Sequence, residues 1–255
     1  ENEKIGLLTK IQKDAIVVAC NQILAGQNRE NFIVDPIQGG AGTSFNMNAN
    51  EVIANIAEVS LGGKLGEYKI IHPNDHVNKG QSTNDVIPTS GKIALIRYFK
   101  ELIEETNQLI DSLNKKAVEF AEVYKMGRTQ LQDAIPMSLG QEFAAYAKVL
   151  SRDVKRFERV IEDLSVVNLG GTAIGTGLNA DKKYVDEVVD VLAKVTGLNL
   201  KQSEDLVDGT QNLDSILFAS SVLKTFAASL SKISNDLRLM SSGPQTGIFD
   251  IKLPA

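Results

Sequence analysis

The sequence predicts an all-α (mainly α) chain whose largest part is a bundle of long helices. Three long runs repeat apolar residues at heptad spacing, which is typical of helices packed along a seam. Aromatic residues make up only 5% of the chain and tryptophan is absent, so aliphatic side chains must supply the core. The hydrophobic content of 43% over 255 residues is sufficient for such a core.

The N-terminal part of the chain predicts shorter helices separated by loops. Thr9 and Gln12 have the spacing of a capping box, which predicts a helix that starts there and stops at Gly26. A second helix is predicted over residues 48–61. Residues 64–90 are polar, and three residues among them are expected to break any long helix: Pro73, Gly80 and Pro88.

The three heptad runs predict helices of about 30 residues, each roughly 45 Å long at about 1.5 Å per residue. The first run consists of Ile96, Phe99, Ile103, Ile110, Leu113, Ala117 and Phe120. The second consists of Leu139, Phe143, Tyr146, Leu150, Phe157, Leu164 and Val167, with Asp153 interrupting it. The third consists of Ile216, Ala219, Leu223, Phe226, Leu230, Ile233, Leu237 and Met240. Because globular helices average about 11–12 residues, these lengths indicate a bundle shared between subunits, with a monomeric bundle as the alternative.

Charge and cysteine content exclude several classes of protein. The net charge is −5 and no basic run is present, so neither nucleic acid nor a membrane is expected as a partner. The single cysteine, Cys20, cannot form an internal disulfide, which favours a reducing, cytoplasmic compartment. No apolar run reaches the roughly 20 residues that span a bilayer. His72 and His76 are four residues apart but lack a third ligand, so no metal site is predicted.

Three polar segments are rich in hydroxyl and amide side chains and poor in charge: residues 42–50, 72–85 and 127–133. Helix caps and turns explain each segment taken alone. Taken together, they predict a pocket for carboxylates. Removing a proton next to a carboxylate gives a doubly negative aci-carboxylate, which requires fixed hydrogen-bond donors around its oxygens. The glycine-rich residues 169–179 are interpreted as a close-packed helix connection, because neither a preceding strand nor a phosphate-binding lysine accompanies them.

These segments resemble the signatures of the aspartase/fumarase superfamily along nearly the whole chain. The matching stretches are Gly-Gly-Ala-Gly-Thr-Ser at 39–44, His-Pro-Asn-Asp-His-Val-Asn at 72–78, Gln-Ser-Thr-Asn-Asp at 81–85 and Gly-Arg-Thr-Gln-Leu-Gln-Asp-Ala at 127–134. The first and third stretches favour the aspartase branch, because class II fumarases resemble Ser-Gly-Ser-Gly-Thr and Gln-Ser-Ser-Asn-Asp there. The resemblance implies part of an N-terminal helical domain over residues 1–90 and part of the central long-helix bundle over 91–255.

The resemblance also implies a chemistry. The expected reaction is elimination of ammonia from L-aspartate to give fumarate, through a Cβ carbanion and without a cofactor. The expected partners are a small dicarboxylate substrate and further copies of the chain, in a homotetramer whose active sites draw on three subunits. Two alternatives stay open: a class II fumarase that interconverts fumarate and malate, and a non-catalytic helical oligomerisation fragment.

The resemblance assigns roles residue by residue. Six residues are expected to bind the substrate: Thr43, Ser82, Thr83, Asn84, Thr129 and Gln130. Four of them are expected to act in catalysis: Ser82, Thr83, Thr129 and Gln130. Three more are expected to form a secondary anion site: His72, Asn74 and Asp75. The resemblance implies that Thr129 and Gln130 reach the substrate from a second subunit.

The chain departs from the superfamily pattern at its C-terminal end. The general base of the superfamily is a serine in a flexible Gly-Ser-Ser-x-Met-Pro loop, and no such loop follows Leu253. Ser241 and Ser242 precede a Gly-Pro turn, so they are not expected to be that base. Gln245 stands where relatives carry Arg, which weakens an anion role for the turn. We therefore expect a piece of a longer chain that has negligible lyase activity on its own.

Overall fold

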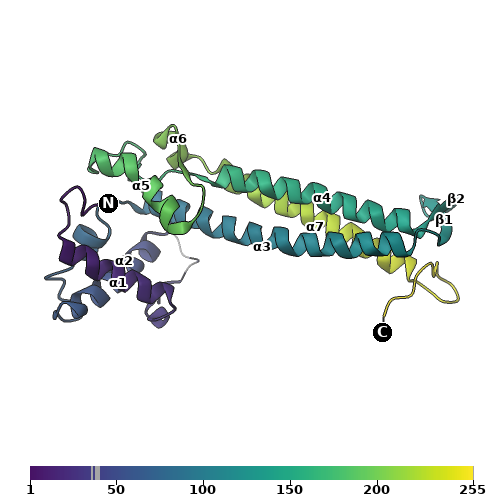
Figure 1. The fold of residues 1–255 in the computed structure, drawn as a ribbon, viewed down its shortest axis with the longest axis horizontal. Helices are drawn as coiled ribbons and strands as arrows, with labels where there is room; N and C mark the ends of the chain where they lie inside the picture. Colours follow the sequence, from purple (N-terminus) through teal and green to yellow (C-terminus); the bar gives the residue numbers. More distant parts are fainter. Residues whose placement is uncertain (36, 38–40, 255) are drawn as a thin grey trace. The chain divides into compact units, whose positions relative to one another are not determined.

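The computed structural model describes residues 1–35, 37 and 41–254 of the chain (Figure 1). Part of the first superfamily stretch, Gly39 and Gly40, lies outside the described residues. The predicted mainly helical class is confirmed. The elements in chain order are α1 Lys10–Leu24, η1 Arg29–Asn31, α2 Thr43–Ser60, η2 Pro73–Val77, α3 Thr83–Glu119, β1 Tyr124–Thr129, β2 Gln132–Ser138, α4 Leu139–Leu164, β3 Val166–Val167, α5 Lys182–Thr196, β4 Lys201–Gln202, α6 Leu206–Gln211 and α7 Asp214–Met240.

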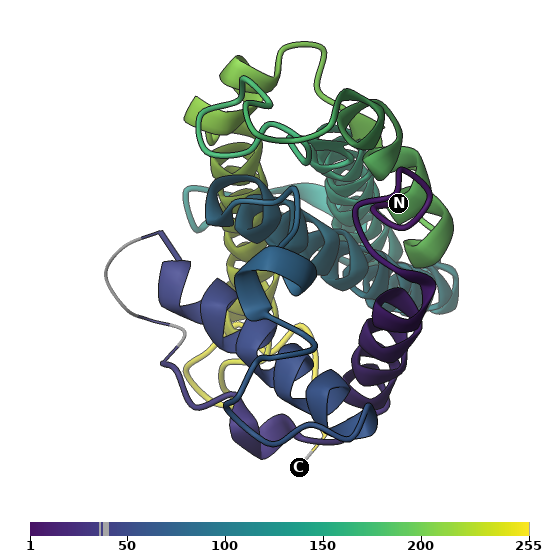
Figure 2. The ribbon, with the colours of Figure 1, turned by 90° about the vertical axis from the view of Figure 1, so that its left-hand side faces the viewer.

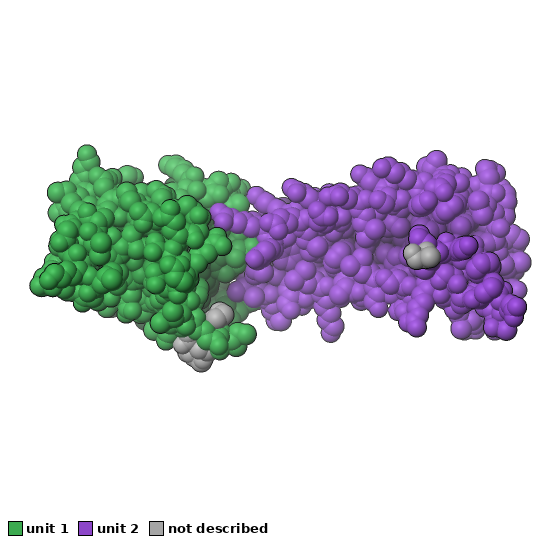
Figure 3. All heavy atoms as spheres, turned by 90° about the horizontal axis from the view of Figure 1, so that it is seen from below, with its two compact units in different colours: residues 1–94, 165–213 green, residues 95–164, 214–255 purple. Residues whose placement is uncertain are grey.

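The chain divides into two compact units (Figure 3). Unit 1 contains residues 1–94 and 165–213, and unit 2 contains residues 95–164 and 214–255. This division differs from the expected two consecutive segments, because residues 165–213 lie with the N-terminal residues. A long-range contact helps to hold them there: the buried Asp85 carboxylate accepts hydrogen bonds from the backbone N–H groups of Gly170 and Thr172.

In unit 1, α1 and α2 lie side by side (Figures 1 and 2). The predicted capping box starts α1: Thr9 Oγ1 accepts from the Gln12 N–H at 3.2 Å, and Gln12 Oε1 accepts from the Thr9 N–H at 3.0 Å. Helix α2 starts five residues before the predicted Asn48, because Gly42 adopts φ +87° and its carbonyl accepts from the Asn46 N–H. Small side chains allow close approach of the two helices: Ala15, Ala19, Ala54 and Ala57.

A buried carboxylate holds the loop after α2. Glu58 is fully buried and accepts hydrogen bonds from the N–H groups of Lys69, Ile70 and Ile71, the shortest at 2.7 Å. Burial acts to raise the pKa of the Glu58 carboxyl, but these three donors outweigh burial and hold the pKa below its ordinary value. The charged form of Glu58 therefore stabilises the folded state.

The prediction that Pro88 breaks the helix is wrong, because α3 runs through it for 37 residues. Proline inside a helix normally leaves the carbonyl four residues earlier without a donor. Here that carbonyl belongs to Asn84, and the side chain of Asn168 donates to it at 3.1 Å. A contact from a distant segment thus replaces the missing backbone hydrogen bond.

Unit 2 contains the predicted long-helix seams. The six residues of the second run that lie in α4 are all buried, and the seam between α4 and α7 includes an edge contact of Phe157 with Phe226, with ring centroids 5.1 Å apart. Asp153 is fully buried in α4 and is paired with Arg156 at 2.6 Å. Helix α7 is less covered: Leu223 remains 38% exposed. By length and composition alone α7 could cross a membrane, contrary to the expectation that no segment could, and 17% of its apolar window is buried in the structure.

A β-hairpin follows α3, where the sequence predicted only a polar connection. β1 and β2 pair antiparallel, and Thr129 faces Gln132 across a two-residue turn. The turn residues Gln130 and Leu131 have φ of +51° and +62°, as a type I′ turn requires at both central positions. Because asparagine and glycine usually occupy these positions, the sequence carried no turn signal there.

We predict that Glu58→Gln lowers the free energy of unfolding at pH 7 by about 2 kcal/mol, because an amide nitrogen would face backbone N–H groups. Since the folded pKa is lowered, the stabilisation by Glu58 is complete above the unfolded pKa of about 4.3 and is lost as pH falls through the folded value. Urea unfolding of the wild type and the variant should therefore show a difference that shrinks below about pH 4. The exposed Glu67→Gln is the control, and a pH-independent difference for Glu58→Gln would contradict the assignment.

Candidate active site

Unit 1 contains a cavity of about 460 Å³ where parts of the first two polar segments meet. Its lining includes Asn46 from α2, Asn74, Asp75 and Asn78 from the loop around η2, and Ser82 and Thr83 at the start of α3. Thr172, Ala173 and Asn179 from the glycine-rich residues 169–179 complete the wall. From the sequence, those glycine-rich residues were interpreted only as a helix connection. Their contribution to the cavity wall was therefore not predicted.

The loop that carries Asn74 and Asp75 is folded by two histidines. His72 Nδ1 lies 3.3 Å from the backbone N–H groups of both Asn74 and Asp75, and accepts from them. His76 Nδ1 accepts from the backbone N–H of His72 at 2.8 Å. Burial lowers the pKa of His76, which favours the neutral ring that this acceptor role requires. Both rings therefore support the backbone of the loop. His72 is not one of the described residues that line the cavity.

Ser82 caps α3 and still presents a hydroxyl proton to the cavity. Its Oγ accepts from the Asn84 N–H at 3.2 Å, and Asp85 Oδ1 accepts from the Ser82 N–H at 2.9 Å, so the two side chains form a reciprocal cap. A hydroxyl has one proton and two lone pairs. With one lone pair occupied by a backbone donor, the O–H of Ser82 can point into the cavity that the residue lines.

Asp85 fixes the back of the cavity. Its carboxylate is fully buried, and Oδ2 accepts from the N–H groups of Gly170 at 3.2 Å and Thr172 at 3.0 Å. Burial raises the pKa of the Asp85 carboxyl above its ordinary value, and the backbone donors act against that rise. Asp85 thereby ties the start of α3 to the loop that forms the other wall.

The electrostatic character of the cavity suits an anion. The N-terminus of α3 carries the positive end of the dipole of a 37-residue helix. Lys79 lines the cavity as well, and Asp75 is the carboxylate in the lining. Among the residues that the structure describes, no group of three or more His, Cys, Asp and Glu side chains could hold a metal ion.

The other predicted site residues lie elsewhere. Thr43 is the first residue of α2 and is exposed, outside the described lining of this cavity. Asn84 is exposed next to the cavity, and its Nδ2 donates to the Ala173 carbonyl at 2.7 Å. Thr129 and Gln130 belong to the hairpin of unit 2, where Gln130 lines a separate cavity of about 340 Å³. The roles assigned to these four residues stay predictions.

The cavity beside Gln130 is surrounded by charges that are already paired. Arg128 Nη1 lies 2.6 Å from Asp250 Oδ2, and Lys125 Nζ lies 2.7 Å from Glu142 Oε2. Two cations, Arg128 and Lys125, therefore surround Asp250, and the hydrogen bonds from both outweigh burial and hold the pKa of its carboxyl below the ordinary value. This cluster fixes residues near the C-terminus against the hairpin.

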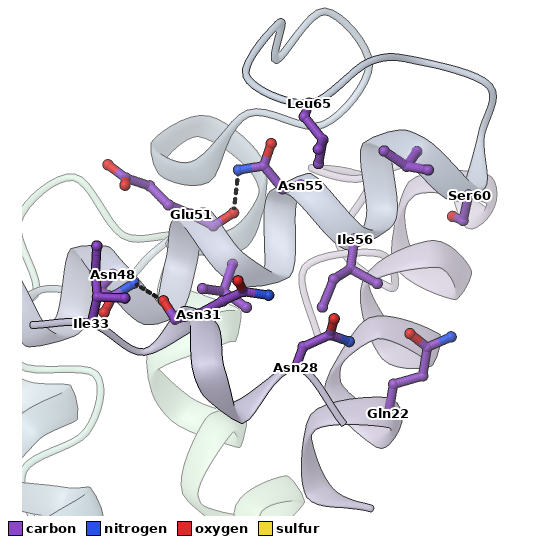
Figure 4. A pocket seen from close by; sticks show the side chains of 12 residues that line it. Gln22, Asn28, Asn31, Ile33, Asn48, Glu51, Asn55, Ile56, Ser60 and Leu65 are labelled. Carbon is purple, nitrogen blue, oxygen red and sulfur yellow. Dashed lines mark hydrogen bonds between the residues drawn. The ribbon is translucent and has the colours of Figure 1, made fainter. Parts of the chain in front are cut away.

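A larger cavity of about 720 Å³ in unit 1 is a poorer candidate (Figure 4). Two of its amides are engaged by the chain: Asn48 Nδ2 donates to the Asn31 carbonyl at 3.0 Å, and Asn55 Nδ2 donates to the Glu51 carbonyl at 2.9 Å. Leu65 and other aliphatic side chains complete the wall, and within the described ranges no lysine or arginine lines it. A dicarboxylate would therefore find no cationic partner in this described lining.

Comparison with known proteins identifies a family. Residues 2–255 match the family described as Lyase. The aspartate ammonia-lyase of Bacillus sp is 52% identical over 254 residues, which cover 100% of this chain and 54% of that protein. The aspartate ammonia-lyase of Escherichia coli (strain K12) is 48% identical over 254 residues, covering 99% of this chain and 53% of that protein. The chain thus spans about half the length of these relatives.

Solved structures also match this chain in sequence and in fold. The fumarate lyase:delta crystallin from Brucella melitensis, bound to cobalt, is 48% identical with a TM-score of 0.97, covering 100% of this chain and 55% of that one. The recombinant class II fumarase from Schistosoma mansoni is 35% identical with a TM-score of 0.90, covering 96% of this chain and 55% of that one. The family is therefore shown by sequence and by fold.

We predict that Asp85→Asn lowers the free energy of unfolding by about 2 kcal/mol, because the new amide nitrogen must face either the Ser82 N–H or the two N–H groups of the 170–172 loop. Chemical denaturation of the wild type and the variant measures this difference. Asp186→Asn, on the exposed side of α5, is the control and should change stability by less than about 0.5 kcal/mol. Equal stability of the Asp85 variant and the wild type would contradict the role given to the buried carboxylate.

Proposed function

This chain belongs to the Lyase family, and we propose that the whole protein that carries it eliminates ammonia from L-aspartate to give fumarate. Relatives of about half-identical sequence are named aspartate ammonia-lyases, which supports this substrate. The observation that carries the proposal is the donor character of the cavity at the start of α3. Both hydroxyls there, of Ser82 and Thr83, have a lone pair occupied by N–H groups of the chain, so their protons are available to a ligand.

The proposed reaction is an anti elimination that begins at Cβ. A base removes a proton from Cβ, and the electron pair moves into the β-carboxylate, giving an aci-carboxylate with two negative charges. The pair then forms the double bond to Cα while the C–N bond breaks, and the nitrogen leaves as ammonia. The hydroxyls of Ser82 and Thr83 would donate to the β-carboxylate and bind its dianionic form more tightly than the ground state.

The remaining substrate contacts are proposed to come from other copies of the chain and from residues outside it. Thr43 would contribute to the β-carboxylate site and Asn84 to the amino group. Thr129 and Gln130 would approach from a second subunit of a cytoplasmic homotetramer. The general base would lie outside the 255 residues, so this chain alone would be inactive. His72, Asn74 and Asp75 would form the secondary anion site, with Asn74 and Asp75 at the cavity wall.

A class II fumarase activity is the second candidate, favoured by the likeness to the Schistosoma mansoni enzyme. The lower identity to that enzyme, 35% against 48–52% for the named aspartate ammonia-lyases, makes it the weaker proposal. Both reactions need a dicarboxylate and a stabilised aci-carboxylate, so the cavity alone does not separate them.

We predict that the whole protein forms fumarate from L-aspartate with release of ammonia and turns over malate far more slowly. Ultraviolet absorbance of fumarate with each substrate, together with an ammonia assay, measures both activities. Turnover of malate without ammonia release would favour the fumarase instead. The purified 255-residue chain is expected to form no fumarate from either substrate, and robust turnover by it would refute the missing base.

We predict that Ser82→Ala and Thr83→Ala each lower kcat/KM for aspartate by about 10²-fold to 10³-fold, since each removes one donor to the developing dianion. Ser90→Ala is the matched control on the same helix, because the Ser90 hydroxyl is exposed and donates to the Ile87 carbonyl. Steady-state kinetics of the three variants and thermal unfolding separate a catalytic loss from a folding loss. Wild-type kinetics in the Ser82 and Thr83 variants would remove the basis of the proposed site.

A further inference from the structure

The hydroxyl of Thr83 has a defined hydrogen-bond polarity. Thr83 is only 9% exposed, lies at the first residue of α3 and lines the cavity. Its Oγ1 accepts from Asn46 Nδ2 at 3.3 Å. Because a hydroxyl whose lone pair faces an amide N–H must direct its proton elsewhere, the Thr83 proton can turn toward the cavity. The direction of that proton therefore depends on which end of the Asn46 amide faces Thr83.

The Asn46 amide is oriented by a chain of hydrogen bonds that begins at a backbone carbonyl. The Gln81 carbonyl can only accept, and Asn78 Nδ2 donates to it at 3.3 Å. Asn78 Oδ1 must then face α2, where it accepts from Asn50 Nδ2 at 3.1 Å and from Asn46 Nδ2 at 3.3 Å. A flipped Asn46 would place its oxygen against the Asn78 oxygen, so the network selects the orientation that donates to Thr83.

Because these amides are buried, reversing their orientation is unfavourable. Asn46 is 5% exposed and Asn50 is 6% exposed, so water competes little for their amide groups. A buried polar group without a partner is strongly unfavourable, and a fully satisfied amide network is correspondingly rigid. The Thr83 hydroxyl is thus held as a donor before any ligand arrives.

We infer that Asn46 is a positioning residue, which fixes the Thr83 hydroxyl as a hydrogen-bond donor to a substrate carboxylate. The inference rests on the proposed function of the cavity and adds a residue to it. Asn46 acts through Thr83, and its amide is already committed to Asn78 and Thr83. Its contribution should grow as the carboxylate gains charge, so it should affect kcat more than KM.

The test is Asn46→Asp in the whole protein, with aspartate as the probe. The two side chains have nearly the same shape, but the new carboxylate accepts the Thr83 proton and turns lone pairs toward the cavity. We expect kcat to fall by about 10²-fold, with a smaller change in KM. Asn46→Ala, which removes the donor without reversing the hydroxyl, is expected to lose less, and it serves as the second variant if the aspartate variant does not fold.

A double-mutant cycle with Thr83→Ala distinguishes positioning from general damage. Without the Thr83 hydroxyl, Asn46→Ala should change kcat/KM by no more than about twofold, whereas independent effects would multiply. Asn48→Asp is the matched control on the same helix, because its amide bonds the Asn31 carbonyl and the Val34 N–H. That control should lower thermal stability and leave kcat unchanged.

The outcomes separate the two proposals. The positioning role is overturned if the losses in the cycle multiply, or if both Asn46 variants keep the wild-type kcat. Neither outcome contradicts the proposed function, because the wild-type protein would still convert its substrate. A wild-type protein that neither converts aspartate or malate nor binds succinate in calorimetry overturns the proposed function, and the positioning role with it. Non-additive losses confined to kcat support Asn46 as the residue that sets the polarity of Thr83.

Discussion

The buried carboxylate of Asp85 is the interaction on which unit 1 depends. It accepts one N–H group from the start of its own helix and two from a loop that lies 85 or more residues further along the chain. These three donors offset part of the cost of burying the carboxylate. The same contacts hold the two walls of the candidate active site together, so the stability of unit 1 and the shape of the cavity have one origin.

The chemistry proposed for the cavity depends on the direction of the hydrogen bonds made by its hydroxyl groups. A backbone N–H group occupies a lone pair of the Ser82 hydroxyl and an amide N–H group occupies one of the Thr83 hydroxyl, so both hydroxyl protons can turn toward a ligand. Such groups need no reorganisation when negative charge develops, which is the most effective form of electrostatic stabilisation in enzymes. The proposed elimination would depend on this arrangement.

Unit 2 carries an exposed apolar surface. Its seams bury one side of the long helices, yet α7 leaves large apolar side chains exposed, among them Leu217 at 69% and Phe218 at 38%. An apolar face of that kind is unfavourable in water and is typical of an association surface. It supports the proposed assembly, in which Thr129 and Gln130 of the hairpin would reach a neighbouring active site.

The sequence by itself determined the features that depend on near neighbours along the chain. Heptad spacing predicted the three long helices and the Thr9–Gln12 pair predicted the start of α1. The density of hydroxyl and amide residues indicated a candidate site, whose role stays a prediction. Tertiary structure decided the rest. Helix α3 passes through Pro88 because Asn168, 84 residues away from Asn84, supplies the missing donor. The polarity of Thr83 likewise depends on Asn46, 37 residues earlier. No local pattern contains such partners, because they meet only when the chain has folded.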